Sequence, residues 1–110
     1  MRSKVEIDAG ICGFKTIVEA KSEDNQYVEF DIVSDCEKIH DLGQELQRNG
    51  AIDSYNEINP VGRSIVMETG RLQLKGCCAG CVVPAGIFKG MQVAAGLALP
   101  RDISIRIAAA

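Results

Sequence analysis

The sequence predicts a single α+β domain over residues 1–110, in which an antiparallel sheet packs against about three helices. Three observations lead to this prediction. Apolar and polar residues alternate through the first third of the chain, as they do in strands with one buried face. Apolar residues recur at helical spacing through most of the remainder, and alternation returns near the end. We therefore expect a three-stranded antiparallel meander, then helices, then a C-terminal strand.

Three strands are predicted over residues 5–9, 14–21 and 28–32. The connections between them are short, and they are polar or rich in glycine, which favours tight antiparallel turns. Every second residue should face a common core. These inward positions are Val5, Ile7, Ala9, Phe14, Thr16, Val18, Ala20, Val28, Phe30 and Ile32.

The first helix should begin after the third strand. Ser34 and Glu37 have the spacing of a capping box, and Gly50 is a plausible terminator. Three apolar residues at helical spacing form the buried face, namely Ile39, Leu42 and Leu46. A second helix is predicted over residues 60–73, with Asn59 as its cap and Pro60 at its first position.

The third predicted helix covers residues 84–98 and is apolar around most of its circumference. Such a helix should be buried between the sheet and the other helices, which implies that Ile87, Met91, Ala95 and Leu97 are inaccessible to solvent. Pro100 should end this helix. Residues 103–107 then alternate between isoleucine and polar residues, which predicts the strand that returns to the sheet.

Composition excludes several classes of function. The net charge of −3 does not suit a nucleic-acid-binding surface, which usually requires a basic face. No stretch approaches the roughly 18 apolar residues of a membrane span. The N-terminal residues enter a strand pattern directly, without an apolar signal segment. We therefore expect a cytoplasmic protein with reduced thiols, and the odd number of cysteines (5) also argues against a disulfide framework.

The cysteines are the most informative residues. Cys12 lies in the turn of residues 10–13, and Cys36 lies at the start of the first predicted helix. The remaining three, Cys77, Cys78 and Cys81, crowd into a loop before the third predicted helix. Cysteines that serve as small core residues tend to fall within apolar runs, whereas these fall at strand ends and helix starts. This placement favours a shared thiolate site.

Helix N-termini lower the pKa of a thiol and offer N–H groups to thiolate or sulfide. Three or four thiolates beside two helix starts suit an iron–sulfur cluster, and the same pocket suits tetrahedral zinc. We expect the ligands to be Cys12, Cys36, Cys78 and Cys81, with Cys77 as an alternate ligand or a sulfur acceptor. The Cys78–Cys81 pair also matches dithiol redox motifs, in which case Cys12 and Cys36 only pack.

Other polar residues carry weaker signals. His40 lies one turn after Cys36 and could share its face, but a lone histidine on a helix is more often a surface residue. No Ser/His/Asp set, phosphate-binding loop or pair of carboxylates stands out. The chain is therefore expected to bind or carry a group rather than to catalyse a reaction.

Two resemblances extend these expectations. Residues 10–14, 34–39 and 81–100, with Ile103, resemble a family of small cysteine-containing proteins of anaerobic bacteria and archaea that has no assigned function. The layout also resembles the U-type iron–sulfur cluster scaffold of the IscU/NifU type, which has a three-stranded meander followed by helices. Cys12, Cys36 and the Cys77–Cys78 pair match the places of its cluster ligands, with Cys77 where that family has histidine.

The resemblance to the scaffold family implies a cluster scaffold, carrier or accessory protein. Its expected partners are a sulfur donor or a cluster-accepting protein, and a homodimer is allowed. Phe14 stands where the scaffold family has an aspartate that favours cluster release, which implies a more stably held cluster. The rival functions are a thiol redox or sulfur-relay protein and a zinc-binding structural or interaction module.

Overall fold

Four strands and four helices make up the regular structure of the computed structural model, which describes residues 1–59, 61–76 and 78–110. The strands form one sheet in the order β1-β2-β3-β4, and every neighbouring pair is antiparallel. The elements are β1 (Arg2–Asp8), β2 (Lys15–Lys21), β3 (Tyr27–Ser34), α1 (Glu37–Arg48), β4 (Ile52–Asp53), α2 (Ser54–Ile58), α3 (Ile65–Leu74) and α4 (Val83–Ala94).

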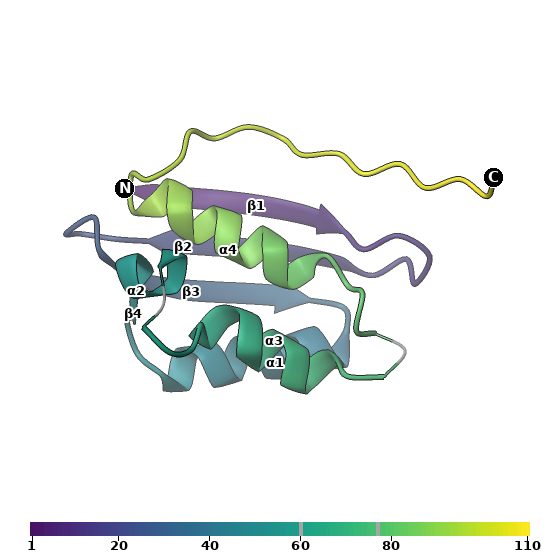
Figure 1. Ribbon diagram of the computed structural model, residues 1–110, viewed down its shortest axis with the longest axis horizontal. Helices are drawn as coiled ribbons and strands as arrows, with labels where there is room; N and C mark the ends of the chain where they lie inside the picture. Colours follow the sequence, from purple (N-terminus) through teal and green to yellow (C-terminus); the bar gives the residue numbers. More distant parts are fainter. Residues whose placement is uncertain (60, 77) are drawn as a thin grey trace.

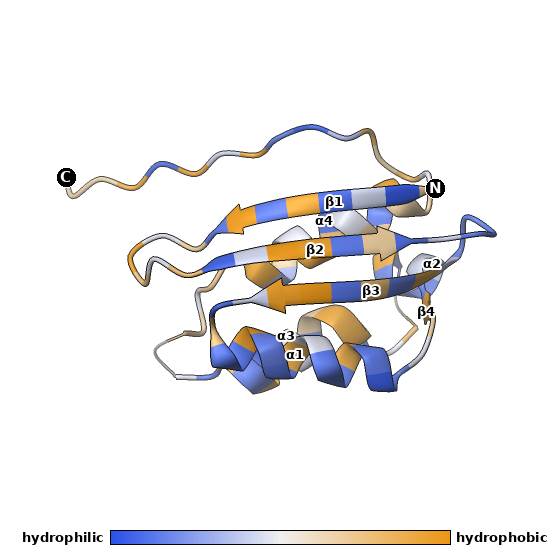
Figure 2. Cartoon of the chain, turned by 180° about the vertical axis from the view of Figure 1, so that it is seen from behind, coloured by the Kyte–Doolittle hydropathy of each residue, from blue (hydrophilic) through white to orange (hydrophobic). Residues whose placement is uncertain are grey.

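The helices lie on one side of the sheet. Helix α4 crosses β1 and β2 in front of the sheet in Figure 1, and it lies behind them when the molecule is seen from the back in Figure 2. Helices α1 and α3 pack on each other beside β3. The α+β class and the predicted antiparallel meander are thus confirmed, and none of the described helices covers the other face of the sheet (Figure 2).

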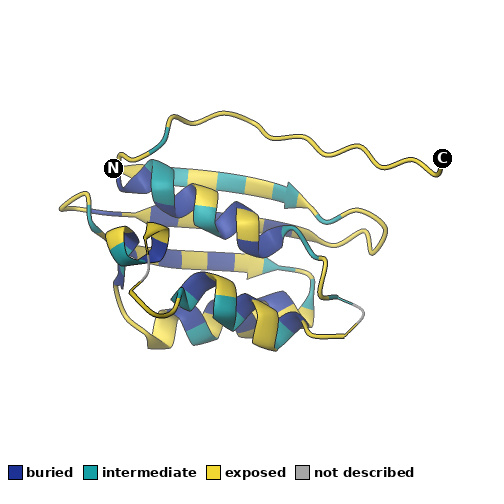
Figure 3. Cartoon of the chain, in the orientation of Figure 1, coloured by how far each residue is buried: buried dark blue, intermediate teal, exposed yellow. Residues whose placement is uncertain are grey.

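The alternation in the sequence corresponds to alternating burial in β2 and β3. The expectation for Phe14 was wrong, because β2 begins only at Lys15 and Phe14 is 42% exposed. In β2 and β3 every second residue is buried beneath the helices, as the dark blue and yellow bands of Figure 3 show. Gly43 of α1 lies against the Ile32 side chain, so this helix can approach β3 closely. The core comprises Val18, Ala20, Val28, Phe30, Ile32, Ile39, Leu42, Leu46, Ile52, Val66, Leu74, Val83, Ile87, Met91, Ala94 and Ala95.

The apolar circumference of α4 is buried as predicted at Ile87, Met91 and Ala95. The prediction for Leu97 was wrong, because α4 ends at Ala94 and not at Ala98, and the Leu97 residue is 41% exposed. Gly96 adopts a positive φ of 74°, and its N–H donates to the Val93 carbonyl. This left-handed residue ends the helix before the last apolar positions can join its buried face.

Helix α1 begins near the predicted position, but its cap differs. Cys36 is the N-cap residue and its side chain makes no capping hydrogen bond, so the Ser34–Glu37 capping box does not form. Ser34 belongs to β3, and its hydroxyl accepts a hydrogen bond from the Cys36 N–H at 3.1 Å. Gly50, with a φ of 68°, follows the last turn as expected.

The second predicted helix begins later than expected. Asn59 is the C-cap of α2, an element that the sequence did not predict, and Pro60 lies outside the described residues. Helix α3 instead begins after Ser64, beside the carboxylate of Glu57. This carboxylate is buried, and it accepts hydrogen bonds from the Ile65 and Val66 N–H groups, both at 2.7 Å. Ser64 is the N-cap of α3, and its hydroxyl accepts a hydrogen bond from the Met67 N–H at 3.2 Å. The additional hydrogen bonds to Glu57, which come from the preceding helix, have no local sequence signature.

The predicted C-terminal strand is wrong. Residues 101–110 form no regular secondary structure and are exposed, and the fourth strand of the sheet is β4. The segment runs alongside β1 (Figure 1), yet among the described residues no backbone hydrogen bond joins the two. Alternating isoleucines alone do not make a strand, because a strand needs a neighbour that pairs with its backbone.

None of the helices in the described parts of the chain has the length and apolar character needed to cross a membrane.

Candidate functional site

Three connections of the chain meet at one end of the sheet. They are the β1–β2 turn, the β3–α1 junction and the segment that leads into α4, all at the same end of the molecule in Figure 1. Antiparallel pairing of β1 with β2 and of β2 with β3 brings the first two together. Gly86 in the first turn of α4 lies against the Ile7 side chain near the end of β1, which brings in the third. Every described cysteine lies on one of these connections.

Cys12 lies at the tip of the β1–β2 turn and is exposed. Gly10 and Gly13 both have positive φ values, 93° and 73°, which residues with a side chain adopt rarely. The Gly13 N–H donates to the Gly10 carbonyl at 2.9 Å, and the Gly10 N–H donates to the Asp8 carboxylate. The two glycines thus allow the tight turn that presents the Cys12 thiol.

Cys36 is half-buried at the first turn of α1 and packs against the edge of the core. A chain of polar contacts sets its position. The Thr16 and Ser34 hydroxyls are 2.7 Å apart, and the Ser34 hydroxyl also accepts from the Cys36 N–H. The Asp35 N–H donates to the Lys15 carbonyl at 3.2 Å. The start of α1 is thereby fixed to the start of β2, just after the turn that carries Cys12.

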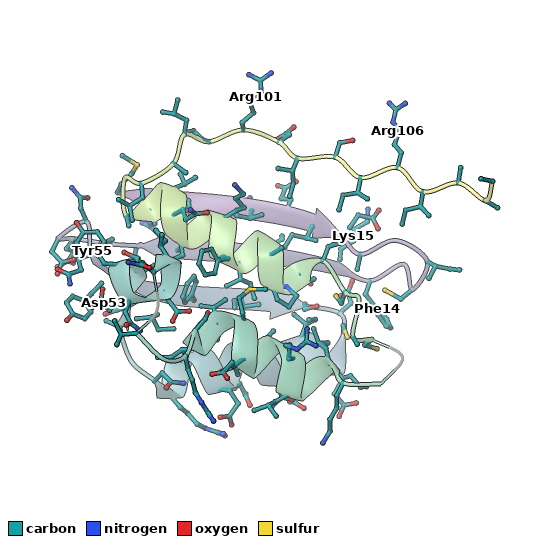
Figure 4. All side chains as sticks on the ribbon, in the orientation of Figure 1. Phe14, Lys15, Asp53, Tyr55, Arg101 and Arg106 are labelled. Atoms are coloured by element: carbon teal, nitrogen blue, oxygen red, sulfur yellow. The ribbon has the colours of Figure 1, made fainter. Side chains whose placement is uncertain are left out.

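Cys78 and Cys81 lie in a single turn before α4, and both are half-buried. The Cys81 N–H donates to the Cys78 carbonyl at 3.0 Å. Helix α4 begins two residues later at Val83, with Pro84 near its start. Both thiols pack against the core from the end of the molecule, where Figure 4 shows sulfur atoms in yellow close to the labelled Phe14 and Lys15.

The Cys81 thiol is electrostatically coupled to the other described cysteines. Burial is the main cause that raises its pKa above the usual range for cysteine. A hydrogen bond from the Val83 N–H acts in the opposite direction, as expected at a helix N-terminus. Negative charge on Cys12, Cys36 or Cys78 raises this pKa further.

The described thiols are near one another but do not form a ready metal site. Within residues 1–59, 61–76 and 78–110, no three side chains of His, Cys, Asp or Glu lie close enough together to hold a metal ion. His40 is exposed on α1, one turn beyond Cys36. Cys77, the predicted alternate ligand, lies outside the described residues.

Sequence reasoning located the cysteines but missed the residues that position them. Thr16 and Ser34 are ordinary strand residues by pattern, and the contact between them depends on the pairing register of β2 and β3. The Val83 N–H could have been anticipated, because Pro84 marks a helix start two residues after Cys81. The lysines near the cysteines, Lys15, Lys38 and Lys75, are exposed.

Comparison with known proteins identifies a family. The model of a family of unknown function, DUF6951, matches residues 3–107, which is nearly the whole chain. The chain belongs to this family. No curated protein and no solved structure matches it. Membership of DUF6951 agrees with the resemblance to a family without an assigned function. The family assigns no chemistry to the cysteines.

Proposed function

We propose that the chain binds an iron–sulfur cluster through Cys12, Cys36, Cys78 and Cys81, as a cluster scaffold, carrier or accessory protein. The observation that supports this most strongly is that the three connections that carry the four thiols all lie at one end of the sheet. Thiolate is the soft ligand that iron–sulfur clusters require, and four thiolates complete a cluster's protein ligands.

The surroundings of the thiols also favour such a cluster. Three of the four are half-buried against the core, where water has limited access. The Val83 N–H approaches Cys81, and N–H donors to sulfur are among the features that stabilise a reduced cluster. The loops that carry Cys12 and Cys78 contain glycines at positive φ, Gly10, Gly13 and Gly76, which allow the backbone to turn tightly beside the thiols.

The proposed partners follow from the accessibility of the site. Cys12 is exposed on its turn and is flanked by the exposed apolar side chains of Ile11 and Phe14. A sulfur donor or a cluster acceptor could therefore reach the thiol and contact apolar surface beside it. U-type scaffolds have an aspartate that favours cluster release at the position where this chain has Phe14. The proposal therefore includes a stably held cluster.

A dithiol or sulfur-relay function is the second candidate. Its support is the single turn that holds Cys78 and Cys81 directly before α4, an arrangement shared with redox dithiols. The raised pKa of Cys81 argues against Cys81 as the attacking thiol, because only the thiolate is nucleophilic. A zinc module remains the third candidate, since zinc accepts the same four thiolates.

Anaerobic reconstitution with iron and sulfide tests the proposal. The wild-type chain should become brown, with iron and acid-labile sulfide bound to each chain. Cys12→Ser and Cys36→Ser should lose most of the iron, because serine oxygen is a harder and weaker ligand than thiolate. Cys77→Ser should retain much of it, since Cys78 is adjacent in sequence. The measurements are iron and sulfide per chain and the visible absorption band.

His40→Ala is the matched control, because His40 lies on the same helix as Cys36 but is exposed. It should bind as much iron as the wild type. Full iron retention in both Cys12→Ser and Cys36→Ser would rule out the four-cysteine site and leave the dithiol function. A colourless protein that carries zinc and does not take up iron would support the zinc module.

A further inference from the structure

Strand β1 forms one edge of the sheet. It pairs with β2 along its whole length, and its other side has no neighbouring strand in the described structure. It is seven residues long and contains no proline. An edge of this kind presents a row of unpaired N–H and C=O groups to any extended chain that fits it.

The hydrogen bonds at the two ends of β1 show which residues carry these unpaired groups. The amino group of Met1 donates to the Ser22 carbonyl, and the Ala9 N–H donates to the Phe14 carbonyl. Odd-numbered residues of β1 therefore direct their backbone groups towards β2. The groups that face outward belong to the even-numbered residues, Arg2, Lys4, Glu6 and Asp8.

These four residues make β1 complementary to itself. The positive side chains, Arg2 and Lys4, precede Val5, and the negative ones, Glu6 and Asp8, follow it. If two copies pair antiparallel about a two-fold axis at Val5, Lys4 faces Glu6 of the second copy and Arg2 faces its Asp8. The same register makes both pairs hydrogen-bonded, because all four residues have outward-facing backbone groups. Charged edges usually discourage pairing, whereas this one matches its own copy.

The inner side of β1 is also incompletely covered. Val5, Ile7 and Ala9 are only half-buried, whereas the corresponding inward residues of β2 and β3 are buried. Figure 3 shows this difference as teal bands on β1 and dark blue bands on β2 and β3. A groove of about 920 Å³ runs along β1 and the neighbouring side of α4. A second copy would continue the apolar row across the two-fold axis.

We propose that β1 is the contact surface for a second copy of this chain, paired antiparallel about Val5 to give a continuous eight-stranded sheet. The existing ion pairs on this strand do not oppose the pairing. Arg2 lies 3.8 Å from Glu19 and Lys4 lies 3.6 Å from Glu6, and all of these side chains are exposed. Ion pairs on the surface contribute little to stability, so these side chains can form new pairs with a second copy. In this dimer the two groups of cysteines lie at opposite ends of the assembly. The dimer proposal does not depend on what the cysteines bind.

The C-terminal segment is the other candidate occupant of the edge. It lines the same groove through Ile103, Ile105 and Ile107, which remain 61%, 67% and 92% exposed. Arg101 and Arg106 point away from the sheet in Figure 4. Since no backbone hydrogen bond holds the described segment to β1, a second copy can displace it at small cost. The experiment below separates the two occupants.

Sedimentation of the full chain over a range of concentrations, with reductant present to prevent disulfides, tests the proposal. The wild type should be a concentration-dependent dimer. Lys4→Glu and Glu6→Lys should each raise the dissociation constant about tenfold, because each places like charges opposite one another twice per dimer. The double variant Lys4→Glu/Glu6→Lys should return to near wild-type affinity. Asp31→Lys, on the same open face but on β3, is the matched control and should dimerise normally.

Glu6→Pro provides a second test that does not rely on charge. It removes an N–H that faces the open edge and leaves the bonds to β2, so the chain should fold and remain monomeric. A wild type that stays monomeric at every concentration would overturn the proposal. A double variant Lys4→Glu/Glu6→Lys that dimerises as weakly as the single variants would also overturn it. Loss of the dimer on deletion of residues 101–110, with the β1 variants unaffected, would assign the contact to the C-terminal segment instead.

Discussion

At the residue scale, Cys81 and Cys12 should differ in reactivity. Burial raises the pKa of Cys81, so a smaller fraction of it is thiolate at neutral pH, whereas Cys12 is exposed on its turn. Because only the thiolate is alkylated, iodoacetamide should modify Cys81 several-fold more slowly than Cys12 in the metal-free protein. The Cys81 rate should still be rising with pH above the usual range of cysteine titration. Pulsed alkylation followed by peptide mass spectrometry measures both rates.

Unfolding the protein in urea is the internal control for this comparison. It removes the burial, and the two cysteines should then react at similar rates. Faster modification of Cys81 than of Cys12 in the folded protein would contradict the buried position of the Cys81 thiol.

The residues that could be predicted from the sequence are those whose position depends on near neighbours. Ala20 and Phe30 each lie between two charged residues, and both are buried as expected. Glu57 could not be predicted, because its burial depends on α3 beginning beside it. A carboxylate in a polar segment looks like surface until the helix that donates to it is in place.

At the element scale, Gly90 allows α4 to lie close to β1. A Cβ built at this position would lie 2.9 Å from a methyl group of Val5, whose branched side chain has little freedom to move. Gly90→Leu should therefore lower the free energy of unfolding by about 2 kcal/mol, since the helix must move away from the sheet. Thermal or urea unfolding followed by circular dichroism measures the change.

Ala85→Leu is the comparison variant, because Ala85 is exposed on the same helix. It should change the free energy of unfolding by no more than about 0.5 kcal/mol. Equal free energies of unfolding for the two variants would mean that Gly90 does not form a close contact between α4 and β1.

The elements that were predicted correctly are those whose pattern lies within their own residues. Alternation marks β2 and β3, and helical spacing with Gly50 marks α1. Helix α3 was misplaced because Asn59–Pro60 offered a competing start signal, whereas the actual N-cap is Ser64. Glu57 of α2 adds hydrogen bonds to the first turn of α3 that no local pattern predicts. The isoleucines of the C-terminal segment showed the period of a strand, but period alone does not supply a pairing partner.

At the scale of the whole molecule, the C-terminal segment should contribute little to stability. Its isoleucines are mostly exposed and its described residues form no ladder with β1. Deletion of residues 101–110 should therefore change the free energy of unfolding by about 0.5 kcal/mol or less. Chemical unfolding of the full and shortened chains at equal protein concentration provides the comparison. A loss of several kcal/mol would show that the segment is part of the folded core.

The thiol site was predictable in outline and not in detail. Meander topology places Cys12 and Cys36 at the same end of the sheet, and a helix start after Cys81 brings the third connection to them. The distances between the sulfurs depend on loop conformations without a repeating pattern. Among the described residues no three side chains of His, Cys, Asp or Glu are arranged so that they could hold a metal ion.

The contact between α4 and β1 joins elements that lie far apart in the sequence, since Gly90 lies against Val5. Strands β1, β2 and β3 pair with their neighbours in sequence, so this hairpin layer can form while a ribosome is still adding residues. Cys12 and Cys36 are then already at the surface of the nascent chain. Cys81 joins them only after α4 has been synthesised and has packed on β1. The described thiols can therefore come together only after α4 has been synthesised, which is later than the synthesis of the three paired strands.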